Sequence, residues 1–491
     1  MKGNERLINM DFTNLEPKGV FRYFYDISQI PRGSGNEKGI SDYLLEFGKS
    51  LGLETIQDDV LNIIIKKPAT KGYENSPTII IQGHMDMVCE KNKDTVHDFL
   101  KDPIDLCIEE DFIKAKDTTL GADNGIAVAM AMALLASKDL EHPPIEVLFT
   151  TNEETSMDGA FGLDPKNLEG KMLINIDSEE EGSLLVSCAG GVNSTVALPI
   201  QKTSSSKNDF YSIFITGLIG GHSGMDINKG RGNANKLLGR LLYGLEKEVD
   251  FELASVNGGS KNNAITRESE ALIGITEEDF SKLKRAITGF ESIIKEELRV
   301  ADPDIIIKLD HAIKPNEVLA QDSKEKAIKL LYLFPHGVNS MSAEIKDLVV
   351  SSNNLGVLTT NIDDITFEGA VRSSIPSLKK DITSKIEALS NLVGAVSKNE
   401  NDYPAWSYNS NSRLREKMKD VYEKIYGSKP DIVAIHAGVE CGLFGDKIEG
   451  LDMISLGPDI IGAHTPTEKL SISSTKRVWE YLLEVLISFK N

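Results

Sequence analysis

The first third of the chain contains two kinds of hydrophobic pattern. Some segments repeat their apolar positions every three to four residues, and others are short, continuous apolar runs. Residues 18–30 and 38–51 place apolar side chains at spacings of three and four, which predicts two amphipathic helices. Short apolar runs that are typical of buried strands follow at 62–65, 78–82, 145–150 and 172–176. The segment 125–137, GIAVAMAMALLAS, is apolar nearly all round and predicts a buried helix. Strands that alternate with helices predict an α/β fold with a mostly parallel sheet and helices on both faces.

The pattern changes near residue 190, where a polar, Ser-rich stretch begins at 202–210. A first round of elements is then predicted, with strands at 211–216, 262–275 and 304–309 and helices at 233–248 and 278–298. A second round follows, with helices at 323–333 and 377–396 and strands around 344–351, 355–361 and 364–372. Two successive groups of strands and helices predict an inserted α+β domain. A duplication of one β-α-β unit within this domain stays open at this point.

The polar stretch 399–412 could return the chain to the first domain, because alternating elements resume after it. The predicted elements there are helices at 413–426 and 474–489 and strands at 432–435 and 453–456. We therefore expect a discontinuous α/β catalytic domain formed by 1–187 and 400–491. An inserted domain of the lid or dimerisation type would occupy 188–399.

Composition and charge narrow the classes of partner. In 491 residues, 54 Lys and Arg face 75 Asp and Glu, a net charge of −21 that would repel nucleic acid. No apolar run approaches the roughly 18 residues needed to span a bilayer. Four scattered cysteines suit a reducing compartment, and the opening MKGNERLINMDF lacks the pattern of a secretory signal. We expect a cytoplasmic protein without nucleic-acid or membrane partners.

The first candidate for chemistry is His84, which directly follows an apolar run in IIIQGHMDMV. Asp86 lies two positions later and, in extended chain, faces the same side. Asp86 could therefore hydrogen-bond the ring nitrogen that His84 does not use for a metal. A buried histidine paired with an acid for structural reasons is the alternative that this pair leaves open.

Acidic residues also follow other predicted strands and turns. Asp123 lies between a turn and the buried helix, Glu153 and Glu154 follow the strand 145–150, and Asp177 ends the strand 172–176. Because ligands gather at the carboxyl ends of parallel strands, these acids are expected to converge with His84. Such acids can also cap the next helix, although four sites in succession make that explanation weaker.

Three further histidines lie in glycine-containing segments. His464 lies in GAHTPTE, His436 in HAGVECG, and His222 in GGHSGMDI within the insert. A turn histidine flanked by glycines, without any role in catalysis, is the alternative for His222.

Seven motifs occur in order along nearly the whole chain: GHMDMV, GADNG, NEET, NIDSEEEG, GGHSGMDINKGRGNANK, HAGVECG and GAHTPTE. Together they resemble the dinuclear-zinc metallopeptidases that include carboxypeptidase G-like enzymes, aminoacylases and dipeptidases. The runs GHMDMVCEKN, LGADNGIAVAMAMALL, HSGMDINKGRGNANKLL and HAGVECGLF are most similar to the aminoacyl-histidine dipeptidase (Xaa-His dipeptidase, carnosinase-like) branch.

The resemblance implies two zinc ions, with cobalt and manganese left open by the chemistry of the ligands. His84 and Asp177 would bind one ion, Glu154 and His464 the other, and Asp123 would bridge them. Three protein ligands per ion leave an open position, as in catalytic zinc sites.

The same resemblance implies roles beyond the metal ligands. Glu153 would be the general base, Asp86 would orient His84, and His222 would stabilise the oxyanion from the lid. The substrate-binding candidates are Arg372, Asn263, His436 and Gly438.

The predicted function is hydrolysis of unblocked dipeptides of the Xaa-His type, with a small peptide as the partner and a homodimer left open. The same metal chemistry would serve an N-acyl amino acid deacylase or a tripeptidase. A metal or peptide binder without turnover is a more distant alternative, because such proteins usually lose a ligand or the base, and all are present here.

Overall fold

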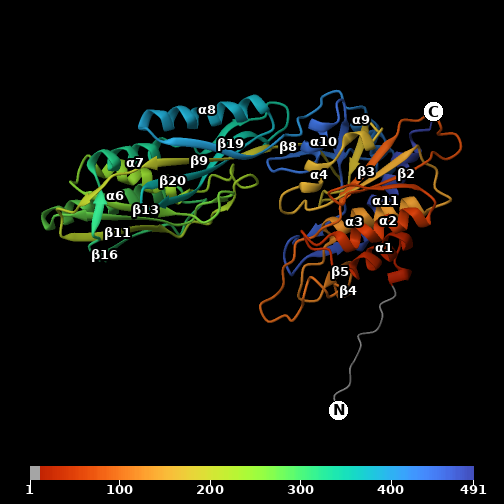
Figure 1. Cartoon of the computed structure of the whole chain (residues 1–491), viewed down its shortest axis with the longest axis horizontal. Coiled ribbons are helices and arrows are strands. Elements are labelled where there is room, and N and C mark those ends of the chain that lie inside the picture. Colours follow the sequence, from red (N-terminus) through yellow and green to blue (C-terminus); the bar gives the residue numbers. More distant parts are fainter. Residues whose placement is uncertain (1–11, 491) are drawn as a thin grey trace, which may run out of the picture. The chain divides into compact units, whose positions relative to one another are not determined.

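The structure of the protein is a computed structural model that describes residues 12–490. Residues 1–11, on which most of the expectation about a secretory signal rests, lie outside the described part. The chain divides into two compact units. Unit 1 comprises 1–186, 408–433 and 443–491, and unit 2 comprises 187–407 and 434–442. Unit 1 thus takes its segments from both ends of the sequence, red to yellow and blue in Figure 1.

The main sheet of unit 1 has the strand order β1-β2-β6-β3-β7-β23-β8-β22. Its strands are β1 (Glu54–Gln57), β2 (Ile63–Lys67), β3 (Ile79–His84), β6 (Ile145–Thr150), β7 (Met172–Asn175), β8 (Ser183–Cys188), β22 (Asp431–Ile435) and β23 (Asp452–Ser455). The four strands β6, β3, β7 and β23 are parallel, whereas β1, β2 and β8 pair antiparallel beside them. Every residue of β3 and β6 is buried, as expected for strands covered on both faces.

Helices cover this sheet and complete the core of unit 1. They are α1 (Lys18–Ser28), α2 (Lys38–Ser50), α3 (Ala122–Ala136), α4 (Asp158–Gly162), α9 (Arg413–Tyr426), α10 (Cys441–Lys447) and α11 (Ile472–Ile487), with α10 crossing the boundary between the units. The side chains of α3 are buried on nearly every side, which confirms the expectation of a buried helix from its Ala- and Met-rich sequence. A smaller antiparallel sheet contains β24 (Ile460–Ile461), β25 (Lys469–Ser471), β5 (Phe112–Ala115) and β4 (Leu106–Glu109).

Unit 2 contains an antiparallel sheet whose strand and helix order repeats. One half is β11 (Asp209–Thr216), α5 (Ala234–Leu245), β13 (Glu252–Gly258), β15 (Ser269–Ile275), α6 (Phe280–Glu297) and β16 (Ile306–Ala312). The other is β9 (Gly190–Pro199), α7 (Gln321–Leu333), β19 (Val349–Thr360), β20 (Asp364–Ser373), α8 (Pro376–Val393) and β21 (Val396–Tyr403). The halves meet where β13 pairs with β19, and the strand order is mirrored on either side. The repeated unit is therefore βαββαβ, and its helices share one apolar core with the sheet.

Three expectations about the insert differ from the structure. Residues 399–412, expected as the polar stretch that leads back to the first domain, begin within strand β21. The residues of this strand are mostly polar and exposed, so they show no apolar alternation. The strands expected at 344–351 and 355–361 are one strand, β19, with β18 (Gly337–Met341) paired beside it. Residue 187 and residues 400–407 and 434–442, expected in the first domain, group with unit 2.

Short pairings complete unit 2, namely β10 (Lys202–Ser204) with β17 (Glu317–Leu319) and β12 (Gly221–His222) with β14 (Ala264–Ile265). Among residues 12–490, no helix combines the length and the apolar composition needed to cross a membrane.

Candidate active site and metal centre

The carboxyl ends of the parallel strands of unit 1 carry the predicted metal ligands. His84 is the last residue of β3, and Glu153 and Glu154 follow the end of β6. Asp177 follows β7, which pairs with β3 on its other side. The order of strands in the sheet therefore brings three segments that are far apart in the sequence to one edge, as expected for parallel strands.

Asp123 lies at the centre of this group, in the first turn of α3. Its Oδ1 atom lies 3.2 Å from Nε2 of His84, and its Oδ2 atom lies 3.0 Å from Nε2 of His464. Nε2 of His84 is also 3.4 Å from Oδ1 of Asp177. Nε2 of His464 is 2.9 Å from Oε1 of Glu154. Each oxygen of Asp123 thus faces the Nε2 atom of one histidine, and each of these Nε2 atoms faces one further carboxylate.

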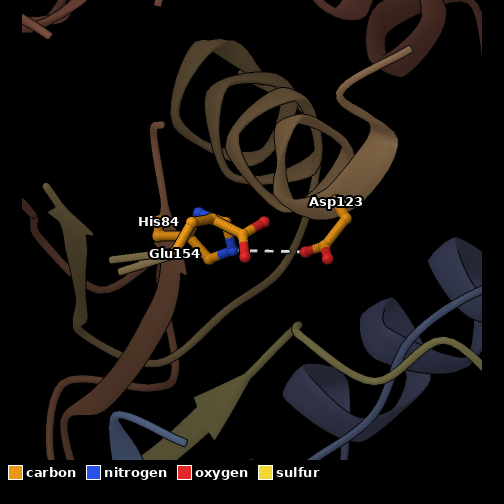
Figure 2. A group of neighbouring side chains, drawn as sticks. All are labelled: His84, Asp123 and Glu154. Carbon is orange, nitrogen blue, oxygen red and sulfur yellow. Dashed lines mark hydrogen bonds and ion pairs between the residues drawn. The ribbon is translucent and has the colours of Figure 1, made fainter. Parts of the chain in front are cut away.

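Figure 2 shows the side chains of His84, Asp123 and Glu154 directed toward one another from three different segments. One ligand atom from each of the three lies within 4.8 Å of the others, a spacing at which they could hold a metal ion. Imidazole nitrogen and carboxylate oxygen are ligands that zinc accepts. The donor set formed by His84, Asp177 and Asp123, and the one formed by His464, Glu154 and Asp123, therefore fit two cations that share Asp123.

Charge within this cluster shifts the pKa values of its members. Hydrogen bonds to Asp123 and Glu154 raise the pKa of His464 to about 11. Burial acts to lower the pKa of His84, but Asp177 and the other carboxylates outweigh it, so that this pKa is raised. Burial raises the pKa of Asp177 to about 6. A divalent cation must displace the protons held here, so cation binding is expected to release protons.

Asp86 connects His84 to the segment that follows β6. Its Oδ1 atom lies 3.2 Å from Nδ1 of His84, and both side chains are buried. The same carboxylate accepts hydrogen bonds from the backbone N–H groups of Glu153 and Glu154 at 3.1 and 3.3 Å, and from the Ser34 hydroxyl at 2.8 Å. Asp86 therefore holds the backbone of Glu153 and Glu154 as well as the ring of His84.

Unit 2 holds the remaining candidates, and His222 lies at one end of its short strand β12. Nδ1 of His222 accepts hydrogen bonds from the backbone N–H groups of Gly224 and Met225, at 3.3 and 3.1 Å. Burial, followed by the charge of Arg372, lowers the pKa of His222. The neutral ring therefore carries its proton on Nε2, which leaves Nε2–H as a donor.

Arg372, on β20, is buried and held by two side chains of unit 2. Its Nε atom donates to the Ser223 hydroxyl at 3.3 Å and its Nη1 atom donates to the Tyr403 hydroxyl at 2.8 Å. Nε2 of His436 lies 2.7 Å from the Ser352 hydroxyl. Burial lowers the pKa of His436 to about 3, so this ring is neutral at physiological pH.

Two of the predicted substrate-binding residues are placed by backbone features. The carbonyl of Asn263 accepts a hydrogen bond from the N–H of Ser223 at 2.8 Å, and the residue itself is exposed. A Cβ atom at Gly438 would lie 2.7 Å from the ring of Tyr403, so no larger residue fits there without movement.

The structure thus brings His84, Asp86, Asp123, Glu154, Asp177 and His464 together in unit 1, with Glu153 next to them in sequence. His222, Arg372, Asn263, His436 and Gly438 lie in unit 2. Sequence reasoning missed three residues that hydrogen-bond to these two groups. Arg32 donates to the backbone carbonyl of Asp86, Glu468 accepts from the N–H of Asp123, and the hydroxyl of Tyr403 accepts from Arg372. Glu468 ends the quoted motif GAHTPTE, and this was the one signal that could have identified it.

Comparisons with known proteins show the family and the fold of this chain. The sequence profile of Peptidase family M20/M25/M40 matches residues 80–488. The cytosol non-specific dipeptidase of Escherichia coli (strain K12) is 39% identical over 477 residues, which cover 97% of this chain and 98% of that protein. The crystal structure of an aminoacylhistidine dipeptidase from Vibrio alginolyticus superimposes with a TM-score of 0.92 at 38% identity, covering 98% of each chain. An aminopeptidase, PepT, from Bacillus cereus has the same fold at 16% identity, with a TM-score of 0.57 over 97% of this chain and 100% of that one.

Proposed function

We propose that this chain, which belongs to Peptidase family M20/M25/M40, is a two-metal dipeptidase that cleaves unblocked dipeptides, Xaa-His dipeptides among them. The single observation that carries the proposal is Asp123, with one carboxylate oxygen facing His84 and the other facing His464. The names of the Escherichia coli and Vibrio alginolyticus relatives support the dipeptide substrate.

Two zinc ions are the proposed cofactors, with cobalt or manganese as chemical substitutes. His84 and Asp177 would hold one ion, His464 and Glu154 the other, and Asp123 both. When bound, such ions would polarise a scissile carbonyl and would lower the pKa of water.

Glu153 is the proposed general base. Its backbone N–H is fixed by Asp86, which also holds His84, so base and ligand are positioned by one carboxylate. The Glu153 carboxylate would take a proton from the attacking water and deliver it to the nitrogen of the leaving amine. Proton transfer by a positioned group of this kind accelerates a reaction by about 100- to 10,000-fold.

Residues of unit 2 are the proposed contacts to the substrate. The Nε2–H of His222 would donate to the carbonyl oxygen as negative charge develops there. Arg372 would bind the C-terminal carboxylate, because a guanidinium matches a carboxylate in a bidentate geometry. Asn263, His436 and Gly438 would line the remaining substrate surface.

The proposal also covers location and assembly. The Escherichia coli relative is named a cytosol enzyme, and all four cysteines of this chain are free, which together favour the cytoplasm. A homodimer would be compatible with the activity and is not required by the ligand set described above.

The test is amine release from a substrate panel by the zinc-loaded protein. The panel contains β-Ala-His, Gly-His, Leu-Leu, one tripeptide and one N-acetyl amino acid, each with and without a chelator. Cleavage of dipeptides that stops on chelation and returns with added zinc supports the proposal. The ratio of Gly-His to Leu-Leu cleavage then measures how much the C-terminal histidine contributes.

Three results would contradict the proposed dipeptidase activity. Cleavage of the N-acetyl compound alone would assign the chain to the deacylases, and cleavage of the tripeptide alone would assign it to the tripeptidases. Metal binding without any hydrolysis would leave a binding protein that has kept the peptidase fold.

A further inference from the structure

The backbone turn that carries Asp123 is held by a carboxylate from the far end of the sequence. Glu468 is buried, with 3% of its surface exposed. Its Oε2 atom accepts hydrogen bonds from the N–H groups of Leu120 and Gly121 at 2.7 and 3.0 Å. Its Oε1 atom accepts from Ala122 and Asp123 at 2.8 and 3.3 Å. Four successive amides therefore converge on one side chain.

The buried side chain of Arg32 also hydrogen-bonds to this turn. Nη2 of Arg32 donates to the carbonyl of Gly121 at 2.5 Å, and Nη1 donates to the carbonyls of Met85 and Asp86 at 3.1 and 3.2 Å. Gly121 has a positive φ of 70°, and a Cβ atom there would lie 2.6 Å from Nη2 of Arg32. A side chain at position 121 would therefore displace Arg32, which links this turn to the backbone that follows β3.

Glu468 also belongs to the loop that presents His464. His464 has a φ of 62°, a left-handed conformation that costs a non-glycine residue about 1 kcal/mol or more. The loop closes through hydrogen bonds from the N–H of Thr465 to Gly462 and from the N–H of Glu468 to Thr465. The segment 464–468 thus meets Asp123 twice, through the imidazole of His464 and through the carboxylate of Glu468.

We infer that Glu468 is a positioning residue that sets the distance between Asp123 and His464, and thereby the affinity and geometry of the cation site these two share. The inference rests on the proposed function, since it concerns the same ligands. Asp123 must serve two histidines at once, so a shift of its backbone changes both of its ligand distances. Partners that orient metal ligands in this way typically contribute about 10- to 100-fold to metal affinity or activity.

A purely structural role is the alternative, because Glu468 also satisfies the N-terminal amides of α3. A carboxylate in that position stabilises any helix through the helix dipole and the capping bonds. Such a role would change the unfolding temperature and nothing at the cations. The test must therefore include a measurement made on the cation site itself.

The experiment compares Glu468→Gln with wild type in the full-length protein. Metal-free protein is titrated with Co²⁺, and the visible absorption spectrum and the two binding constants are recorded. We expect one of the two Co²⁺ affinities to fall by about 10- to 100-fold and the absorption band of that site to change. We also expect kcat to fall more than KM rises, because substrate contacts are untouched.

The matched control is Glu146→Gln, at another buried glutamate whose carboxylate accepts backbone N–H groups. Glu146 is 2% exposed and accepts from Glu169 and Gly170 at 2.9 to 3.0 Å, near the start of β6. The predicted ligand Glu154 follows the other end of that strand. This variant should lose stability and keep both Co²⁺ affinities and the spectrum.

Glu468→Asp keeps the charge on a shorter side chain and decides the outcome if Glu468→Gln does not fold. When both variants fold, the Co²⁺ affinity of Glu468→Asp should lie between those of wild type and Glu468→Gln. When only Glu468→Asp folds, its Co²⁺ affinity should lie below that of wild type. Folded variants with wild-type affinities and spectra would overturn the inference and leave the proposed function intact. Wild-type protein that binds no Co²⁺ and cleaves no dipeptide would overturn both.

Discussion

Replacing Asp86 with asparagine tests how one buried carboxylate organises the candidate active site. Burial acts to raise the pKa of Asp86, but hydrogen bonds from His84, Ser34 and Glu153 outweigh it, so that the group is ionised in the folded protein. An asparagine has one oxygen and one NH2 group in place of the two oxygens. The NH2 group must then face the N–H of either Glu153 or Glu154, which are both donors.

The magnitude follows from the bonds that are lost. Asp86→Asn removes one hydrogen bond to a charged acceptor and weakens the contact to Nδ1 of His84. A hydrogen bond to a charged group contributes about 1.5–3 kcal/mol. Because this bond exists without zinc, its loss lowers the free energy of unfolding. The zinc affinity should fall by about 10- to 100-fold, the usual effect of losing a partner that orients a histidine ligand. The expected kcat is also reduced, because the backbone of Glu153 loses its anchor.

The assay is calorimetric titration of metal-free protein with Zn²⁺, alongside thermal unfolding. The control is Asp111→Asn, at a carboxylate that accepts from the N–H and hydroxyl of Ser473 and the hydroxyl of Ser471 at the start of α11. Both variants should unfold at lower temperature, and only Asp86→Asn should lose zinc affinity. Wild-type zinc affinity in a folded Asp86→Asn protein would refute the reasoning.

Two further predictions follow. Glu153→Gln should lower kcat by about 100- to 10,000-fold while two zinc ions stay bound, measured by dipeptide turnover and metal analysis; loss of zinc together with activity would contradict a role as base. The His436 pKa of about 3 lies below the usual 6.5, so between these pH values the unfolded chain binds a proton that the folded chain excludes. The stability of metal-free protein should therefore fall with falling pH below 6.5, by up to about 1.4 kcal/mol per unit from this residue. Urea unfolding of His436→Gln between pH 6.5 and 4.5 should show a smaller slope, and an unchanged slope would contradict this origin.

The candidate residues that meet in unit 1 could be predicted because most of them directly follow a predicted strand. His84 ends an apolar run, and Glu154 and Asp177 follow others, so the rule for parallel sheets was sufficient to expect that they meet. The contact between Glu468 and the turn at Asp123 joins residues more than 340 positions apart. No periodicity carries information about such a pairing, and only the folded chain reveals it.

The insert was harder to predict because its strands break the expected patterns. Asn353 and Asn354 interrupt the apolar run of β19, which therefore was expected as two strands. Both are fully buried, and their amides donate to backbone carbonyls of Pro335, Asn262 and Ala264. Polar residues inside a strand are read from sequence as a break unless their buried partners are known.

The place of β23 between β7 and β8 has a consequence for how the enzyme is made. This strand and the loop with His464 come from the last tenth of the sequence, whereas the other four predicted ligands precede residue 180. A ribosome adds about 5–20 residues per second, so the roughly 290 residues between Asp177 and His464 take about 15 to 60 s to synthesise. During this time the edge of β7 that pairs with β23 lacks its neighbour, so its backbone N–H and C=O groups are unpaired there. Until the segment around His464 has been made, the nascent chain lacks one of the five proposed ligands, so we expect it to bind two zinc ions only after that segment is present.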